Sequence, residues 1–277
     1  MRQWLTLVVI GWLHAAALAQ NAPLGETTGT AWEHTPQSLA LSVQQGDLCL
    51  PARVTGTQVV CGKFKDLASQ ASASRVPVVL FLHGSSGLGL KAIGEWQRWL
   101  AGQGYASLAP DSFALTGRVT YKSPIDKIAY ERIHALRASE IAPALAALQA
   151  QAWADTRRLV LAGASEGAVP VARHADAAFA ARIIYAWSCE DNYFVQSARN
   201  AFPAQQPVLN VISTVDPFFS SSNSWLGGTS AKGHCGAALA GNPQSAVVLV
   251  PDAPHTLLNW PAARLATAGF LTMLGKP

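Results

Sequence analysis

The residues best suited to chemistry are a serine between two glycines, Gly163-Ala164-Ser165-Glu166-Gly167, directly after the apolar run 159–162. In enzymes that transfer acyl groups, a serine on such a strained strand-to-helix turn acts as the nucleophile, and the glycines avoid collisions with neighbouring backbone. Amides at the start of the following helix favour negative charge. This setting predicts that Ser165 is a nucleophile rather than part of an ordinary glycine turn.

A nucleophilic serine needs a base within reach, and the base needs an acid that orients it. Asp216 follows the apolar run 208–213, and His255 follows the apolar run 246–250. In α/β-hydrolases the acid and then the histidine follow the serine along the chain, each after a strand of the sheet. Because parallel strands end at one edge of a sheet, we expect Asp216, His255 and Ser165 to meet there.

Other residues compete for the roles of acid and base. Asp252 lies three residues before His255, Asp191 follows an earlier apolar run, and His234 lies in a loop rich in glycine and serine. The order of the strands favours Asp216 as the acid and His255 as the base.

Acyl transfer also develops a negative oxygen, which backbone N–H groups must stabilise. One donor is expected to be the amide of Glu166, and the other the amide of Ser85 in the loop 83–87, with Ser86 as second choice. The carboxylate of Glu166 would oppose this charge unless it turns away or is neutralised. It is either an acid in the first turn of a helix, which the helix dipole favours, or a residue that contacts substrate or senses acid.

Aromatic residues follow two of the strands at the same edge, so an aromatic-lined cleft is expected, with Trp187, Phe218 and Trp225 contacting the substrate. No metal site is predicted, because the sequence has no HExxH and its seven histidines are dispersed. Glycine-rich nucleotide motifs are also absent after the apolar runs. No cofactor is expected.

The elements that must position these residues alternate between apolar runs and helical patterns from residue 76 onward. Continuous apolar runs predict strands covered on both faces, and their alternation with helices predicts a mostly parallel sheet. The chain is therefore assigned to the α/β class, with helices on both faces of the sheet. The expected strands are 76–82, 105–109, 158–162, 182–187, 208–213 and 246–250. Helical spacing covers 125–152, with a break before Pro143, and 261–274.

Before residue 76 the pattern changes to short β-rich runs at 39–43, 48–54 and 58–64, separated by glycines. They are predicted to be antiparallel edge strands. Residues 1–19 combine Arg2, an apolar stretch and a small-residue cleavage pattern, which indicates a secretory signal peptide rather than a membrane anchor. We expect residues 20–75 to be a lead-in with edge strands that forms a single domain with the catalytic core, 76–277.

The composition indicates a globular protein with a large core. Hydrophobic residues make up 50% of the chain and charged residues only 13%, which favours a large core. The net charge is +4 and the lysines and arginines are scattered along the chain, so nucleic acid is not an expected partner. A stable membrane anchor is not expected either, because the apolar stretch near the N-terminus is too short to span a bilayer. An even set of four cysteines in an exported protein predicts disulfides, and of three possible pairings we favour Cys49 with Cys61 and Cys189 with Cys235.

The motifs Leu82-His83-Gly84-Ser85-Ser86-Gly87 and Gly104-Tyr105-Ala106-Ser107-Leu108-Ala109-Pro110-Asp111-Ser112-Phe113, the Gly163–Gly167 turn, and Asp216 with His255 together resemble the dienelactone hydrolase family. The resemblance covers about Val76 to the C-terminus. It implies an α/β-hydrolase fold, a nucleophile-acid-histidine triad, ester or lactone substrates and no cofactor. The chain departs from that family in having Ser165 where dienelactone hydrolases use cysteine, and in its signs of export to the periplasm or medium.

The sequence therefore predicts a serine hydrolase that cleaves small-molecule carboxylic esters or lactones through an acyl-enzyme. An acyltransferase or peptidase would use the same triad with a different acceptor or substrate. A binding protein of this fold without catalysis is the third reading, which the intact Ser165, Asp216 and His255 disfavour. The identity of the ester and the oligomeric state are left open.

Overall fold

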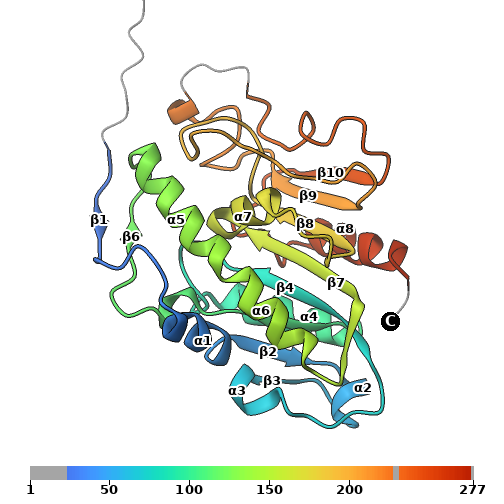
Figure 1. Ribbon diagram of the computed structural model, residues 1–277. Coiled ribbons are helices and arrows are strands. Elements are labelled where there is room, and N and C mark those ends of the chain that lie inside the picture. Colours follow the sequence, from blue (N-terminus) through green and yellow to red (C-terminus); the bar gives the residue numbers. More distant parts are fainter. Residues whose placement is uncertain (1–23, 227–230, 276–277) are drawn as a thin grey trace, which may run out of the picture.

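The computed structural model describes residues 24–226 and 231–275, and the expected signal peptide, residues 1–19, lies outside them. Its centre is an eight-stranded sheet with the order β10-β9-β8-β7-β4-β5-β2-β3 (Figure 1). The six strands from β10 to β5 are parallel, whereas β2 is antiparallel to both β5 and β3. The strands of this sheet are β2 (Asp47–Leu50), β3 (Val60–Lys63), β4 (Val76–Leu82), β5 (Ala106–Ala109), β7 (Ala154–Ala164), β8 (Ala181–Tyr185), β9 (Val208–Ser213) and β10 (Ser245–Val250). The predicted fold class is confirmed.

Helices cover both faces of the sheet (Figure 1). The longer ones are α1 (Pro36–Gln44), α4 (Lys91–Gly102), α5 (Lys127–Ser139), α6 (Ile141–Gln149) and α8 (Pro261–Met273), and the short ones are α2 (Ala52–Thr55), α3 (Phe64–Leu67) and α7 (Ala168–Arg173). One core packs α4 and α8 against the sheet, and the other packs α1, α5, α6 and α7 against the opposite face.

Strand β4 shows why both faces are filled. Its side chains alternate, with Val78 and Leu80 in one core and Val79 and Phe81 in the other, and none of these four is exposed to solvent. Successive side chains of a strand point to opposite faces, so a strand buried between two helical layers must be apolar throughout. This is the physical basis of the continuous run at 76–82.

The N-terminal region corrects one prediction. Residues 39–43 belong to helix α1 and not to an edge strand. Thr35 caps this helix by accepting a hydrogen bond from the Ser38 amide, Ser38 caps back onto the Thr35 amide, and Pro36 occupies the first turn. These are helix-start signals, and they outweigh the β-rich appearance of the short apolar run.

The other two N-terminal runs form strands, although shorter ones than predicted. β2 ends at Leu50, because Pro51 follows and leads into α2, and β3 begins only at Val60. Cys49 and Cys61 are register partners on these strands and form a disulfide with a Cα–Cα distance of 4.1 Å. The predicted pairing of these cysteines is confirmed.

The predicted helix 125–152 is broken as expected. α5 ends at Ser139 and α6 begins at Ile141, which places Pro143 in the first turn of α6, where a proline does not remove a helical hydrogen bond. A two-stranded sheet of β1 (Thr27–Thr28) and β6 (Thr120–Tyr121) holds the start of the described chain near α5. Within the ranges 24–226 and 231–275, no helix is long and apolar enough to cross a membrane.

Candidate active site

The turn around Ser165 requires glycine on both sides. β7 ends at Ala164, Ser165–Gly167 form a single 3₁₀ turn, and α7 follows. A Cβ atom on Gly163 would lie 2.4 Å from the carbonyl oxygen of Gly167, and one on Gly167 would lie 2.2 Å from that of Leu82. Ser165 itself has a φ of 53°, a left-handed conformation that is strained for a residue with a side chain. The close packing explains the spacing of the glycines, and the strain is typical of a functional residue.

Asp216 and His255 lie together, as predicted from the strand order. His255 Nδ1 is 2.7 Å from Oδ2 of Asp216, and Oδ1 of Asp216 accepts hydrogen bonds from the amides of Phe218 and Phe219. The Asp216 side chain is fully buried, whereas that of His255 is 19% exposed. With Nδ1–H donated to the carboxylate, Nε2 of His255 is left as the basic nitrogen.

The competing residues lie in other arrangements. Asp191 accepts a hydrogen bond from the amide of Ala198, and Nδ1 of His234 accepts one from the amide of Gly236. Asp252 is exposed. Among the described residues, Asp216 is the carboxylate that contacts the His255 ring.

Ser165 and His255 line one pocket together with Ser85, Ser86 and Ala186. We call it the slot; its volume is about 480 Å³, counting space that is open to solvent. The nucleophile, the base and the loop predicted to stabilise the oxyanion therefore face one space.

The loop after β4 is fixed from below by His83, which is fully buried. His83 Nδ1 lies 2.7 Å from the carbonyl oxygen of Gly84, and the amide of Ser112 donates to Nε2 at 3.2 Å. The ring therefore carries its proton on Nδ1. Burial, together with the charge of Arg137, lowers the pKa of His83 well below its usual value, so the ring is neutral. Arg137 also donates to the carbonyl oxygen of His83 at 2.8 Å.

Glu166 points away from the slot, which answers the question raised by its position beside the nucleophile. Its carboxylate Oε1 accepts from Arg118 at 2.6 Å and from Arg137 at 2.9 Å, and its side chain has no exposed surface. Burial alone would raise the pKa of Glu166, but the charges of the two arginines outweigh burial and hold the pKa below its usual range. The carboxylate is thus neutralised by the two arginines, and Glu166 is not among the residues that line the slot.

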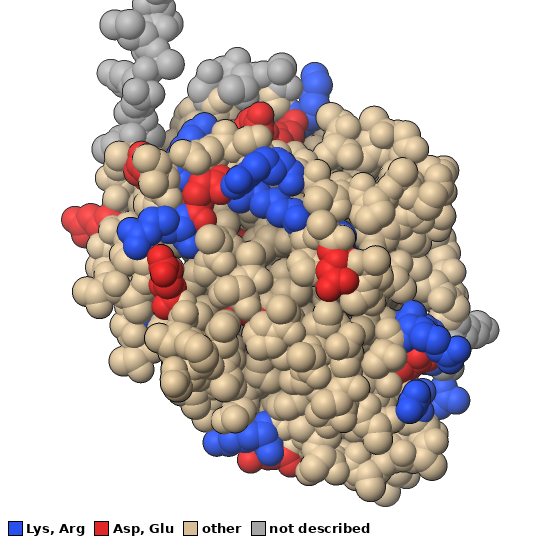
Figure 2. Space-filling model, in the orientation of Figure 1, with Lys and Arg blue, Asp and Glu red and all other residues tan. Residues whose placement is uncertain are grey.

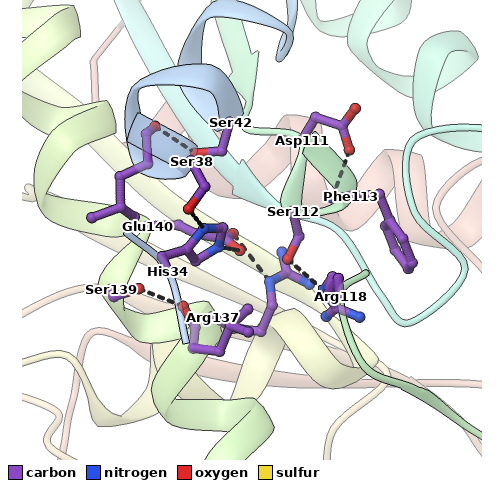
Figure 3. A network of polar contacts seen from close by, with 12 residues as sticks. His34, Ser38, Ser42, Asp111, Ser112, Phe113, Arg118, Arg137, Ser139 and Glu140 are labelled. Carbon is purple, nitrogen blue, oxygen red and sulfur yellow. Dashed lines mark hydrogen bonds and ion pairs between the residues drawn. The ribbon is translucent and has the colours of Figure 1, made fainter. Parts of the chain in front are cut away.

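The charges around Glu166 continue into a buried ionic cluster, which we define as His34, Arg118, Arg137, Glu140 and Glu166. Arg137 pairs with Glu140 at 3.0 Å, and Glu140 contacts His34 at 3.1 Å. Figure 3 shows this part of the cluster, with Ser38 bonded to His34 and Ser112 bonded to Arg118. The cluster joins the nucleophile turn, the loop after β5, helix α5 and the N-terminal segment.

The three aromatic residues predicted to contact substrate lie in different surroundings. The Trp187 ring has no exposed surface and packs on Phe219 in the core. Phe218 packs on the His255 ring with centroids 4.6 Å apart, and Trp225 is half-buried beside Phe218. None of the three is among the residues that line the slot.

The second predicted disulfide is also present. Cys189 and Cys235 are bonded, with a Cα–Cα distance of 4.8 Å. Beneath it, Asn210 of β9 accepts from the amide of Cys235 and donates to the carbonyl oxygen of Trp187. The loop after β8 and the loop that follows Asp216 are thereby held together beside the site.

The sequence reasoning missed the apolar walls of the slot and both arginines of the ionic cluster. Leu90 and Ile93 line the slot from the start of α4, and Leu257 and Leu258 line it from just after His255. The two leucines could have been found from their place beside the predicted base. Arg118 carries no local signal, because its partner Glu166 is distant in sequence. Arg137 has the helical i,i+3 spacing to Glu140, but nothing local relates it to Glu166.

Neither the charges on the face drawn in Figure 2 nor the metal-binding side chains of the described residues indicate a second site. On the face drawn in Figure 2, lysine and arginine lie beside aspartate and glutamate in mixed groups. Among the ion pairs, Arg173 and Arg199 both pair with Glu131. In the part of the chain that the structure describes, no three histidine, cysteine, aspartate or glutamate side chains are grouped to hold a metal ion.

Comparison with known proteins gives a family and a fold. The model of the dienelactone hydrolase family matches residues 65–259. A putative dienelactone hydrolase from Klebsiella pneumoniae subsp. pneumoniae MGH 78578 is similar with a TM-score of 0.53 and 16% identity, over 75% of this chain and 90% of that chain. A cold-adapted esterase from an Arctic intertidal metagenomic library is similar with a TM-score of 0.50 and 18% identity, over 82% of this chain and 92% of that chain. No curated protein sequence matches.

Proposed function

The chain belongs to the dienelactone hydrolase family and is a carboxylic ester hydrolase, and from this premise we propose that it works through an acyl-enzyme on Ser165. His255 acts as the base and Asp216 as the acid that orients it. The observation that carries the proposal is the 2.7 Å contact between His255 and the buried Asp216, in a site where Ser165 and His255 line the same slot.

In the first half of the reaction, Oγ of Ser165 attacks the ester carbonyl carbon while Nε2 of His255 takes the hydroxyl proton. The C–O bond to the alcohol then breaks, and His255 returns the proton to the departing alkoxide. In the second half, water attacks the acyl-enzyme, His255 takes a proton from the water and gives it to Ser165, and the carboxylic acid leaves. Asp216 stays ionised and stabilises the imidazolium.

Each tetrahedral intermediate places a negative charge on the former carbonyl oxygen. We assign the amides of Ser85 and Glu166 to this oxygen, because one belongs to the loop that borders the slot and the other directly follows the nucleophile. The Glu166 carboxylate does not oppose this charge, since Arg118 and Arg137 neutralise it on the far side of the turn.

We also propose that the enzyme is exported and acts in the periplasm or the medium. The two disulfides support this location, because such bonds persist in oxidising compartments and are rare in the cytosol. The signal-peptide pattern of residues 1–19 supports it independently.

The proposal is tested with purified protein that begins after residue 19, by release of p-nitrophenol from p-nitrophenyl acetate and by labelling with a fluorophosphonate. We expect turnover, and a label on Ser165 located by mass spectrometry. Ser165→Ala should lower kcat by about 10⁴-fold or more and abolish the label. Folded wild-type protein that neither turns over nor becomes labelled would overturn the proposal and leave a binding role.

A further inference from the structure

The walls of the slot are apolar. Phe81 and Tyr185 have no exposed surface, and Ile93, Leu257 and Leu258 are at most 2% exposed, yet all five line the space in front of Ser165. The exposed lining residues are instead small and hydroxylated: Ser85, Ser86 and Thr256. The slot therefore has apolar, buried walls and a polar, exposed rim.

Ionisable groups are scarce in this space. No lysine, arginine, aspartate or glutamate is among the described residues that line the slot. Apart from His255, the only titratable side chain there is Tyr185, whose hydroxyl bonds to Thr267 at 2.6 Å. Burial raises the pKa of Tyr185, so its hydroxyl is uncharged at neutral pH.

Arg118 and Arg137, which pair with the residue directly after the nucleophile, do not line the slot. Arg118 is bonded to Glu166, Ser112 and the carbonyl oxygen of Val119. Arg137 is bonded to Glu166, Glu140 and the carbonyl oxygen of His83. Both side chains are buried on the other side of the turn, and neither lines the slot.

We infer that the slot binds the apolar half of an uncharged ester, alkyl or aryl, and rejects a substrate that carries a carboxylate in that half. This inference rests on the proposed function. Apolar surface gains free energy when it leaves water for the walls of the slot. A carboxylate in the same place would lose its hydration and find no cation in return, which is costly.

The test compares esters that match in length and differ in one carboxylate. For the acyl half, the pair is p-nitrophenyl hexanoate and mono-p-nitrophenyl adipate. For the alcohol half, it is hexyl acetate and 6-acetoxyhexanoate, followed by acetate release. In the pair that varies the half entering the slot, kcat/KM should be at least about tenfold higher for the uncharged ester than for the charged one. Similar values within both pairs, or a preference for the charged esters, would overturn the inference.

A substitution in the slot sharpens the test. Leu90→Arg adds a cation to a half-buried lining position, and it should raise the relative kcat/KM of the charged ester by about tenfold. Leu88→Arg is the matched control, because Leu88 is also half-buried and does not line the slot. If Leu90→Arg does not fold, Thr256→Lys at the exposed rim replaces it. An equal change in the control, or no change in a folded slot variant, would contradict the inference.

The proposed function and the inference fail in different ways. If Ser165 is labelled and all four esters are hydrolysed without regard to charge, only the inference about the slot is wrong. If Ser165 is not labelled and no ester is hydrolysed, the proposed function is wrong, and the inference falls with it.

Discussion

The two sides of the nucleophile turn differ completely in charge. On one side lies the slot, whose described lining residues include no side chain with a permanent charge. On the other side lies the ionic cluster, in which two arginines and two glutamates are buried with at most 1% of each side chain exposed. Ser165 and Glu166 are adjacent in sequence, yet one faces the slot and the other the cluster.

Charge is buried in this protein where a side chain of opposite charge lies beside it. In the cluster each carboxylate has a guanidinium partner, so its desolvation is offset by a short ion pair. The described residues that line the slot offer a carboxylate no such partner, so the slot suits uncharged ligands. The left-handed Ser165 makes this separation possible, because the tight turn sends consecutive side chains to opposite sides.

Removing one arginine of the ionic cluster should have the largest effect on stability. Arg137→Leu leaves Glu140 and Glu166 buried without their shared cation, and we expect a loss of about 3–5 kcal/mol in the free energy of unfolding, measured with urea. The control is Arg157→Leu, because Arg157 has a side chain that is 90% exposed, and its loss should cost under about 1 kcal/mol. Equal losses in the two variants would mean that the cluster has no special weight.

A smaller effect is expected when only the charge of Glu166 is removed. Glu166→Gln keeps the shape but weakens the bonds to Arg118 and Arg137, at a cost of about 2 kcal/mol in the free energy of unfolding. Because Arg137 also holds the His83 carbonyl, kcat should fall by about tenfold with little change in KM. Glu95→Gln, at an exposed ion pair, should change neither quantity. An unchanged kcat in folded Glu166→Gln protein would show that the cluster does not position the loop.

Acid should act on the cluster and spare the slot. The arginines hold the pKa values of Glu140 and Glu166 below the ordinary value of 4.5 despite burial. Their stabilisation is therefore complete above that pH and is lost as the pH falls through the lowered values. We expect the free energy of unfolding, measured with urea, to fall between pH 5 and pH 3 more in the wild type than in the Glu140→Gln/Glu166→Gln variant. The difference between the two losses should be roughly 1 kcal/mol or more.

The titration of His83 does not change the expected difference between the two proteins. Its lowered pKa makes the folded state lose stability as the pH falls below 6.5, but it does so in both proteins. Parallel pH curves for the wild type and the double variant would contradict the assignment of charged pairs to the cluster.

The smallest effect is expected in the slot. Ile93→Val removes one methylene from a wall that is 2% exposed, and it should cost about 1 kcal/mol in the free energy of unfolding. It should also lower kcat/KM for p-nitrophenyl hexanoate several-fold, because the ester loses apolar contact. Ile128→Val, at a position that is 62% exposed on α5, is the control and should leave both quantities unchanged. A fall in kcat/KM in both variants would remove Ile93 from the binding surface.

Local sequence patterns predicted most of the fold and part of the site. The central strands were predictable because a strand covered on both faces must be apolar throughout, as β4 is. The contact of Asp216 with His255 was predictable because parallel strands end at one edge. The helix at 36–44 was missed, although Thr35, Pro36 and Ser38 formed a recognisable cap, because the short run after them looked like a strand.

The ionic cluster could not be predicted in the same way. His34 and Glu140 are 106 residues apart, and Arg118 and Glu166 are 48 apart, so no spacing or periodicity relates them. Trp187 illustrates the opposite difficulty. Its position after a strand is compatible with a cleft or with the core, and only the packing of Phe219 against its ring places it in the core.

The contact of His34 with Glu140 also bears on the order in which the chain can fold during its synthesis. His34 leaves the ribosome long before the residue that completes its surroundings exists, and β1 likewise waits for β6, about 90 residues later. The N-terminal segment therefore lacks these docking partners until residues 120–140 have been made. In the export that we propose, such a delay would help this segment to pass through a translocation channel before it docks.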